Sequence, residues 1–249
     1  MRRGSVQLAA PPVTPVVKVV LISSGVLFLL QLILETFGGF SLTPLLGFVP
    51  VRMLSGWFWQ LFTYSFLHAS MFHLLFNLLV IWTVGSELES LWGSRTFTAF
   101  YVVCALGAAL THGGFALLGI GGGPETPVIG SSGVVYGLLL AYGILFGERT
   151  MYFFMLFPMQ ARFFVLLLGA VELVSSVFSG RDGVSHLAHL GGMVAGFGCL
   201  AAMALWKKRQ RLAAATDHVS KERKKRLKKA GHLRLVPGSE EEDEPKHWN

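Results

Sequence analysis

Six apolar stretches, bounded by polar or glycine-rich segments, set the pattern of the chain. Each approaches the length of about 20 residues that a helix needs to cross the hydrocarbon core of a bilayer. We predict six membrane-spanning helices, at about 16–36, 69–88, 97–118, 131–147, 161–178 and 185–206. The pattern therefore predicts an all-α bundle inside a membrane.

Three connecting segments are more than simple turns. Residues 37–68 are too numerous for a turn and contain the aromatic stretch 57–59, so we expect short amphipathic helices at the membrane interface. Gly and Pro fill 119–127, which we expect to be irregular. The apolar run 150–158 ends at a proline and is expected to link two spans along the interface.

The composition agrees with a membrane protein. Of the 249 residues, 53% are hydrophobic and only 14% are charged, whereas an ordinary soluble domain is about 25% charged. So few charges cannot coat a globule in water, and so many apolar residues exclude a disordered chain and argue against a nucleic-acid partner. Cys104 and Cys199 lie in apolar runs and are expected to behave as small hydrophobes.

The positive charge is concentrated after the last apolar stretch. Thirteen of the 21 Lys and Arg residues follow Trp206, so the net charge of +7 belongs to the tail. An N-terminus inside the cell leaves only Arg52 and Arg181 in outer loops, and the positive-inside rule favours that arrangement. We therefore expect a multi-pass protein of the cell (inner) membrane with both termini in the cytoplasm.

The same patterns divide the chain into three parts. We predict a cytoplasmic N-terminus at 1–15, a six-helix domain at 16–206 and a charged cytoplasmic tail at 207–249. The tail is basic at 221–229 and acidic at 240–244, and we expect it to be mostly disordered. A helix lying on anionic lipid is the alternative for the tail.

Polar side chains, which are costly inside a bilayer, gather at the start of three predicted helices. The second span opens with His68, His73 and Asn77, the fourth with Gly130-Ser131-Ser132-Gly133, and the sixth with His186 and His189. With the N-terminus inside, all three helices run inward, so these clusters lie at a similar depth near the outer face. The apolar part of the fourth span would be only about 20 Å long, so we expect a water-filled cavity above its start.

Small side chains recur at every fourth position of two of these helices: Gly133, Gly137 and Ala141 in the fourth span, and Ala188, Gly192 and Gly196 in the sixth. Such stripes let two helices approach backbone to backbone, which would bring Ser132 within reach of His189. A serine hydroxyl needs a base to become a nucleophile, and histidine is the side chain best suited to that task near neutral pH. The sequence therefore predicts a Ser–His dyad.

Groups that could support the dyad are fewer. Asp182 is a loose candidate for a third, acidic member, and Glu172 in the fifth span is interpreted only as a buried hydrogen-bonding or cavity-lining residue. Ser132 starts a helix, where free N–H groups favour an oxyanion. His73 and Asn77 are four residues apart on one helix face and can both donate hydrogen bonds there.

These residues resemble the rhomboid intramembrane serine proteases. The resemblance rests on Gly130-x-Ser132-Gly133 followed by Tyr136, on Ala188-His189-x-x-Gly192-x-x-x-Gly196, on His68, His73 and Asn77, and on Glu89 with Gly93. It covers about 16–206 and not the tail. It implies a six-transmembrane-helix rhomboid-like bundle with a long outer loop between helices 1 and 2.

The resemblance also implies roles. Ser132 would be the nucleophile and His189 the general base, with His73, Asn77 and the Ser132 backbone N–H as the oxyanion hole and Tyr136 packed on the His189 ring. The supporting glycines would be Gly130, Gly133, Gly192 and Gly196. The expected partners are transmembrane protein substrates, cut near the outer surface, and membrane lipids, without nucleic acid, cofactor or metal.

One position departs from the family pattern. Rhomboids often have Trp-Arg in the first long loop, whereas Trp59 is followed here by Gln60. This difference bears on the lipid contacts of that loop and leaves the chemistry unchanged.

Three other functions compete with proteolysis by serine. A non-catalytic rhomboid-like protein would bind membrane helices without cutting them. A metalloprotease would use His68, His73, His186 and His189, but no H-E-x-x-H motif is present and no carboxylate accompanies these histidines in the sequence. A transporter would place polar groups at the midplane of two repeated halves. We interpret His68 and His186 as structural, and His112, which has no clear partner in the sequence, as packing alone. We interpret Glu89 as fixing the inner end of the second span by hydrogen bonding.

Overall fold

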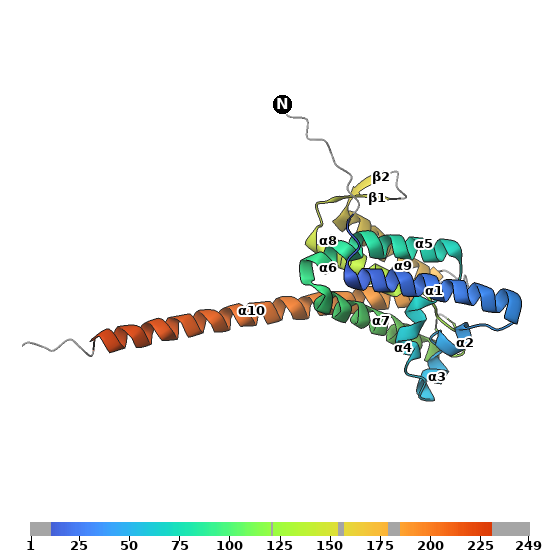
Figure 1. Cartoon of the computed structure of the whole chain (residues 1–249), viewed down its shortest axis with the longest axis horizontal. Coiled ribbons are helices and arrows are strands. Elements are labelled where there is room, and N and C mark those ends of the chain that lie inside the picture. Colours follow the sequence, from blue (N-terminus) through green and yellow to red (C-terminus); the bar gives the residue numbers. More distant parts are fainter. Residues whose placement is uncertain (1–10, 121, 154–156, 179–184, 231–249) are drawn as a thin grey trace, which may run out of the picture. The chain divides into compact units, whose positions relative to one another are not determined.

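The computed structural model describes residues 11–120, 122–153, 157–178 and 185–230. Its internal contacts divide the chain into two units, Met1–Ala201 and Ala202–Asn249. The first unit contains the helical bundle (Figure 1), and the second contains the charged part of the last helix. Each unit is described by itself.

Long helices form close to the predicted spans. They are α1 (Pro15–Gly38), α5 (Met71–Val80) continuing through a π-helical turn (Ile81–Gly85) into α6 (Ser86–Trp92), α7 (Ser94–Leu117), α8 (Ser132–Leu145), α9 (Ala161–Phe178) and α10 (His186–Ala230). Within the described residues, five helical stretches are long and apolar enough to cross a membrane, and α8, with 14 residues, is shorter. Within the first unit α1 runs alongside α5 and α7 (Figure 1). The all-α architecture expected from the sequence is confirmed.

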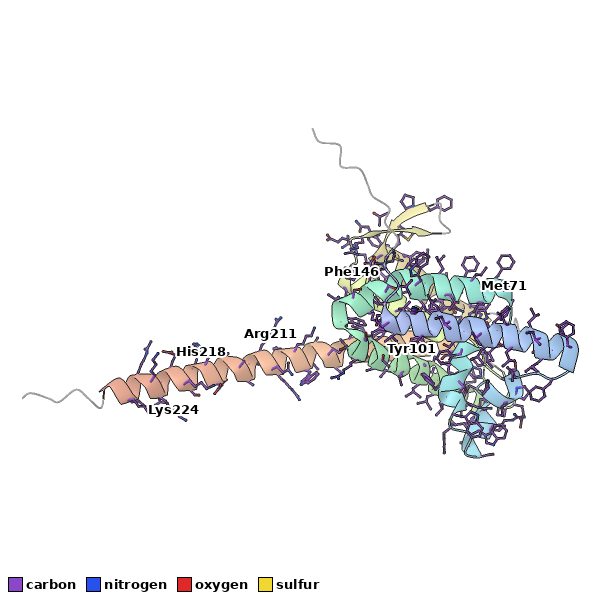
Figure 2. All side chains as sticks on the ribbon, viewed as in Figure 1. Met71, Tyr101, Phe146, Arg211, His218 and Lys224 are labelled. Carbon is purple, nitrogen blue, oxygen red and sulfur yellow. The ribbon has the colours of Figure 1, made fainter. Side chains whose placement is uncertain are left out.

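The bundle is apolar on its outside as well as in its core. Large side chains that are exposed to the surroundings cover α1, α5 and α9, and Phe72 and Phe76 of α5 are 74% and 64% exposed. Figure 2 shows such side chains projecting from α5, which begins at the labelled Met71. In contrast, nine of the 14 residues of α8 are buried. An apolar outside is typical of helices that contact lipid, and α8 is the helix that the others enclose.

Four short helices replace a simple connection between α1 and α5: α2 (Thr43–Leu46), α3 (Pro50–Leu54), α4 (Gln60–Thr63) and the 3₁₀ helix η1 (Tyr64–Phe66). Gln60 is fully buried among them. Its Oε1 accepts from the Val49 N–H at 3.1 Å, and its Nε2 donates to the carbonyls of Pro44 and Leu45 at 3.0 and 3.3 Å. The residue that departs from the family pattern therefore holds the loop together, because an amide both donates and accepts.

Glu89 anchors the start of α1. Its carboxylate accepts from the backbone N–H groups of Val16 and Val17, both at 3.0 Å, and from the hydroxyls of Thr14 at 2.5 Å and Ser94 at 2.6 Å. The first N–H groups of a helix have no partner within the helix, so a carboxylate from α6 caps α1. The expectation that Glu89 fixes its end of the second span by hydrogen bonding is confirmed.

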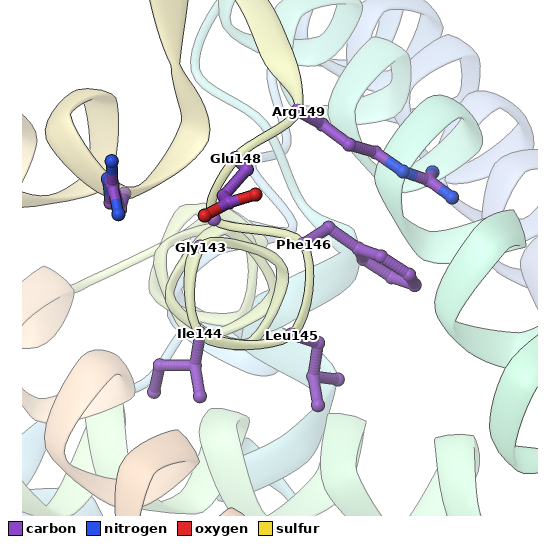
Figure 3. A pocket seen from close by; sticks show the side chains of 8 residues that line it. Gly143, Ile144, Leu145, Phe146, Glu148 and Arg149 are labelled. Atoms are coloured by element: carbon purple, nitrogen blue, oxygen red, sulfur yellow. The ribbon is translucent and has the colours of Figure 1, made fainter.

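The predicted interfacial link at 150–158 contains a hairpin of two antiparallel strands, β1 (Thr150–Phe153) and β2 (Phe157–Gln160), with Thr150 paired to Gln160. Beside it, a cavity of about 450 Å³ is lined by the C-terminal end of α8 together with Glu148, Arg149 and Arg162 (Figure 3). Arg149 forms an ion pair with Glu87 of α6. At 1.5 Å per residue this cavity lies about 20 Å from the first residue of α8.

The expectation of a disordered tail is wrong for its first half. Helix α10 continues without a break to Ala230, so 207–230 is helical. The reason is local: this segment is rich in Ala, Leu, Lys, Arg and Glu, which are strong helix formers, and Lys221 pairs with Asp217 one turn away at 2.7 Å. Figure 2 labels Arg211, His218 and Lys224 along it. The acidic stretch at 240–244 lies outside the described residues.

Candidate active site

Ser132 and His189 meet at the start of two helices. Ser132 is the first residue of α8, and His189 lies in the first turn of α10. The His189 Nε2 is 2.8 Å from the Ser132 Oγ, which is the distance of a good hydrogen bond. The pair predicted from the sequence is therefore brought together, 57 residues apart in the chain.

The helices can bring this pair together because glycines face each other between them. A Cβ atom on Gly192 would collide with the Gly133 carbonyl, and one on Gly196 would lie 3.3 Å from the Gly137 Cα. The predicted contact between the two stripes is confirmed. A second close approach, which the stripes did not indicate, joins α10 to α7, where Gly191 meets Thr111 at the same level. α10 is thus fixed on two sides.

The neighbouring serine has a different partner. The Ser131 Oγ lies 3.3 Å from the His68 Nε2, and the His68 backbone N–H donates to Gln31 at 3.2 Å. His68 is 1% exposed, and this burial lowers its pKa to about 4, so its ring is neutral at physiological pH. These contacts link α1, the loop before α5 and α8, which agrees with the structural role expected for His68.

A carboxylate lies behind His189. The Glu172 Oε2, on α9, is 3.0 Å from the His189 Nδ1 and 2.7 Å from the His186 Nδ1, and its Oε1 accepts a hydrogen bond from the Tyr136 hydroxyl. The 3.0 Å contact between Glu172 and His189 is within ion-pair distance, but it does not have the geometry of a hydrogen bond. The expectation of a pair without an acid beside it is corrected, whereas the interpretation of Glu172 as a buried hydrogen-bonding residue is confirmed.

Glu172 was not expected at the site because of its place in its helix. We expect site residues at the starts of helices that run inward, whereas α9 runs in the opposite direction and carries Glu172 in its second half. Ala161, Val165 and Glu172 are the residues of α9 that are buried, and they share one helix face toward α8. Asp182, the other candidate acid, lies outside the described residues.

Tyr136 lies flat on the His189 ring. The ring centroids are 4.4 Å apart and the planes are inclined by 12°. Because Tyr136 is one turn after Ser132 in α8, the helix that carries the hydroxyl also carries the surface on which the imidazole rests. The stack and the Glu172 contact together restrict rotation of the imidazole.

His73 of α5 lies beside the start of α8, and Asn77 follows it one turn along α5. The His73 ring packs against Gly130, where an added Cβ would lie 2.6 Å from its Cε1, and Gly130 has a φ of 115° that favours glycine. Asn77 is buried, and its Nδ2 has no hydrogen-bond partner among the described residues. Asn77 thus holds a buried donor without a partner one turn along α5 from His73.

His112 also has a partner, which corrects the interpretation of it as packing alone. Its Nδ1 lies 2.8 Å from the Ser185 Oγ, and that oxygen accepts from the Ala188 N–H at 3.3 Å. Ser185 directly precedes α10, so α7 helps to hold the end of the helix that carries His189.

Glu172, His186 and His189 are also the residue types of a metal site, and one ligand atom from each lies within 4.8 Å of the others. The expectation that no carboxylate accompanies the histidines is therefore wrong, because the fold brings Glu172 next to His186 and His189. However, 2.7 Å between Glu172 and His186 is a direct hydrogen bond, whereas two ligands of a tetrahedral zinc, each about 2.1 Å from the metal, stand about 3.4 Å apart. The group is arranged to share protons, and a metal would have to push its members apart.

Comparison with known proteins identifies the family of the chain. The Rhomboid domain model matches residues 55–207. Over 154 residues the chain is 28% identical to the rhomboid protease GluP of Bacillus subtilis (61% of this chain and 27% of that protein), and over 153 residues it is 30% identical to the mitochondrial Rhomboid protein 1 of Saccharomyces cerevisiae (59% and 43%). It is 34% identical over 150 residues to the rhomboid protease GlpG of Pectobacterium atrosepticum (59% and 48%). The chain spans less than half the length of these relatives. The matched domain covers most of the bundle and every residue of the site, so this integral membrane protein belongs to the rhomboid family.

Proposed function

We propose that this chain is an intramembrane serine endopeptidase in which Ser132 is the nucleophile and His189 the general base. The observation that carries the proposal is the 2.8 Å contact between the Ser132 Oγ and the His189 Nε2. It is supported by the relatives that bear the name rhomboid protease. A non-catalytic helix-binding protein is the alternative, and it would have no use for this contact.

The reaction follows from the chemistry of the pair. As the Ser132 Oγ bonds to the carbonyl carbon of the substrate, its proton passes to the His189 Nε2 and the carbonyl oxygen becomes an oxyanion. The imidazolium then gives that proton to the leaving amine, and the C–N bond breaks. Water hydrolyses the resulting ester through the same steps in reverse order, which restores Ser132 and neutral His189. This second half requires the water-filled cavity that the sequence predicts.

The oxyanion needs donors that are already in place. The Ser132 backbone N–H, at the start of α8, has no acceptor within the helix, His73 packs against Gly130 just before that start, and Asn77 follows His73 one turn along α5. Asn77 is the stronger candidate, because its buried Nδ2 has no partner among the described residues in the free protein. Donors that meet charge only in the transition state accelerate the reaction.

The expected setting is a cell membrane with both termini in the cytoplasm. The five long helices and the enclosed α8 would then form six spans within a domain at 16–206. Ser132 would lie near the outer face, and the substrates would be transmembrane proteins, cut where a segment of helix unwinds at the site. Membrane lipids would surround the apolar exterior.

Cleavage by site variants tests the proposal. The protein is reconstituted in liposomes with a single-span protein that carries small residues near its outer end. Ser132→Ala and His189→Ala should abolish cleavage, whereas Ser131→Ala is the matched control and should keep it. If Ser131→Ala were the inactive serine variant, the nucleophile would be assigned to the wrong residue. Loss of cleavage in EDTA would instead support a metalloprotease that uses Glu172, His186 and His189, against which the 2.7 Å hydrogen bond between Glu172 and His186 argues.

A further inference from the structure

We propose that Glu172 is a positioning residue that makes the Ser132–His189 pair a triad. The inference rests on the proposed function, because it concerns the same two residues. It departs from a dyad, which the sequence alone favoured, and assigns the third member to α9.

The reaction requires one particular tautomer of His189. To accept the Ser132 proton at Nε2, a neutral imidazole must carry its own hydrogen on Nδ1. That hydrogen needs an acceptor, since Nδ1 is buried. The Glu172 Oε2 lies 3.0 Å from Nδ1, which is ion-pair distance, although the geometry in the free protein is not that of a hydrogen bond. A carboxylate at this distance favours the tautomer with its hydrogen on Nδ1, which is the tautomer that the reaction uses.

Glu172 also supplies a negative charge next to the cation that forms during the reaction. Proton transfer turns His189 into an imidazolium in a setting where Glu172 is only 5% exposed. A carboxylate beside Nδ1 stabilises that cation, as the acid of a Ser-His-Asp triad does. An ionisable side chain buried in a membrane helix is costly enough to need such an explanation.

The carboxylate of Glu172 is itself held in a fixed position. The Tyr136 hydroxyl donates to Oε1, and the His186 Nδ1 contacts the other oxygen, Oε2, at 2.7 Å. Tyr136 also stacks on His189. The groups that face His189 thus come from α8 (Ser132 and Tyr136), α9 (Glu172), α10 (His186) and α5, whose His73 lies near enough to act on it electrostatically.

The test compares Glu172→Gln with Glu87→Gln in the full-length protein. Glu87 is a matched control because its carboxylate also forms an ion pair, with Arg149, near the other end of α8. The probe is a fluorophosphonate, which forms a bond from phosphorus to the serine Oγ while fluoride leaves and the proton passes to the base. The limiting rate of labelling, kinact, measures how well His189 activates the Ser132 hydroxyl, and KI measures how tightly the probe binds before it reacts.

We expect Glu172→Gln to lower kinact at least tenfold, toward the loss of about 10⁴-fold that follows removal of the orienting charge in a soluble triad. KI should stay unchanged. The midpoint of the acid limb of the pH–rate profile should move to lower pH, because the imidazolium has lost its counter-charge. Glu172→Asp should restore part of the rate, and Glu87→Gln should behave like the parent protein.

Two results would overturn the triad. One is a Glu172→Gln protein that keeps kinact and the pH profile but has a lower thermal midpoint, since Glu172 would then only hold α9 in place. The other needs no variant: ¹⁵N-histidine spectra of the parent protein should show neutral His189 protonated on Nδ1, and protonation on Nε2 would contradict the inference. In either case the parent protein would still label at Ser132. Absence of labelling in the parent would instead contradict the proposed function.

Discussion

The backbone carbonyl of Gly133 occupies the space that a side chain on Gly192 would need. This contact lies one residue after Ser132 and three residues after His189, so it sets the separation of the two helices at the site. The same face of each helix repeats the contact one turn further on, between Gly137 and Gly196. The position of the imidazole therefore depends on glycines that do no chemistry.

Gly192→Ala should destabilise the protein and reduce cleavage together. A methyl group there meets backbone, which cannot rotate away, and overpacking of this kind costs about 1–3 kcal/mol or more. Thermal unfolding in detergent and cleavage in liposomes measure the two effects. Gly198→Ala, on the same helix, is the control, because an added Cβ there meets nothing within 4 Å. Equal thermal midpoints for the two variants would contradict the packing of α8 on α10.

His73→Ala and Asn77→Ala should reduce turnover with little change in the thermal midpoint. Loss of one oxyanion donor typically costs about 10²–10³ in rate, whereas a structural hydrogen bond between membrane helices is worth nearer 0.6 kcal/mol. His68→Ala is the contrast, because its contacts with Gln31 and Ser131 join three parts of the bundle. Variants at His73 and Asn77 that lose stability but keep turnover would have no part in the oxyanion hole.

Glu89→Ala should lower the free energy of unfolding by about 1–3 kcal/mol, because the N–H groups of Val16 and Val17 lose their acceptors. The loss should be confined to stability, with the rate per folded molecule unchanged. Glu87→Ala breaks a more exposed ion pair and should cost no more than about 1 kcal/mol. Denaturant titration of both proteins makes the comparison, and a larger loss for Glu87→Ala would rule out the cap.

Gln60→Arg, which restores the common family residue, should lower the thermal midpoint of this protein. Arginine has no acceptor for the Val49 N–H that Gln60 Oε1 now binds. A buried guanidinium would also need partners that this loop gives to an amide. Gln60→Glu keeps an acceptor and separates the two effects. An Arg variant as stable as the parent would show that the loop does not depend on this amide.

The fold and the Ser132–His189 pair could be predicted because both depend on short-range patterns. The length of each apolar stretch predicts a helix, and small residues at every fourth position indicate which helix faces meet. Glu172 could not be placed, because its rotation about α9 and the depth of that helix depend on packing against α8. The partner of His112 could not be predicted either, because Ser185 lies just before α10, belongs to no motif, and meets His112 only through the packing of α10 on α7. The helical tail was missed because high charge was interpreted as disorder, whereas residue-by-residue propensity favours helix.

The most direct test of the central claim is to find which residue a fluorophosphonate modifies. The full-length protein is labelled in detergent with and without EDTA, digested, and the modified peptide is identified by mass spectrometry. We expect a single adduct on the Ser132 Oγ, insensitive to EDTA, absent from Ser132→Ala and His189→Ala, and retained in Ser131→Ala. An adduct on Ser131, or cleavage activity that persists in Ser132→Ala and is lost in EDTA, would contradict the account.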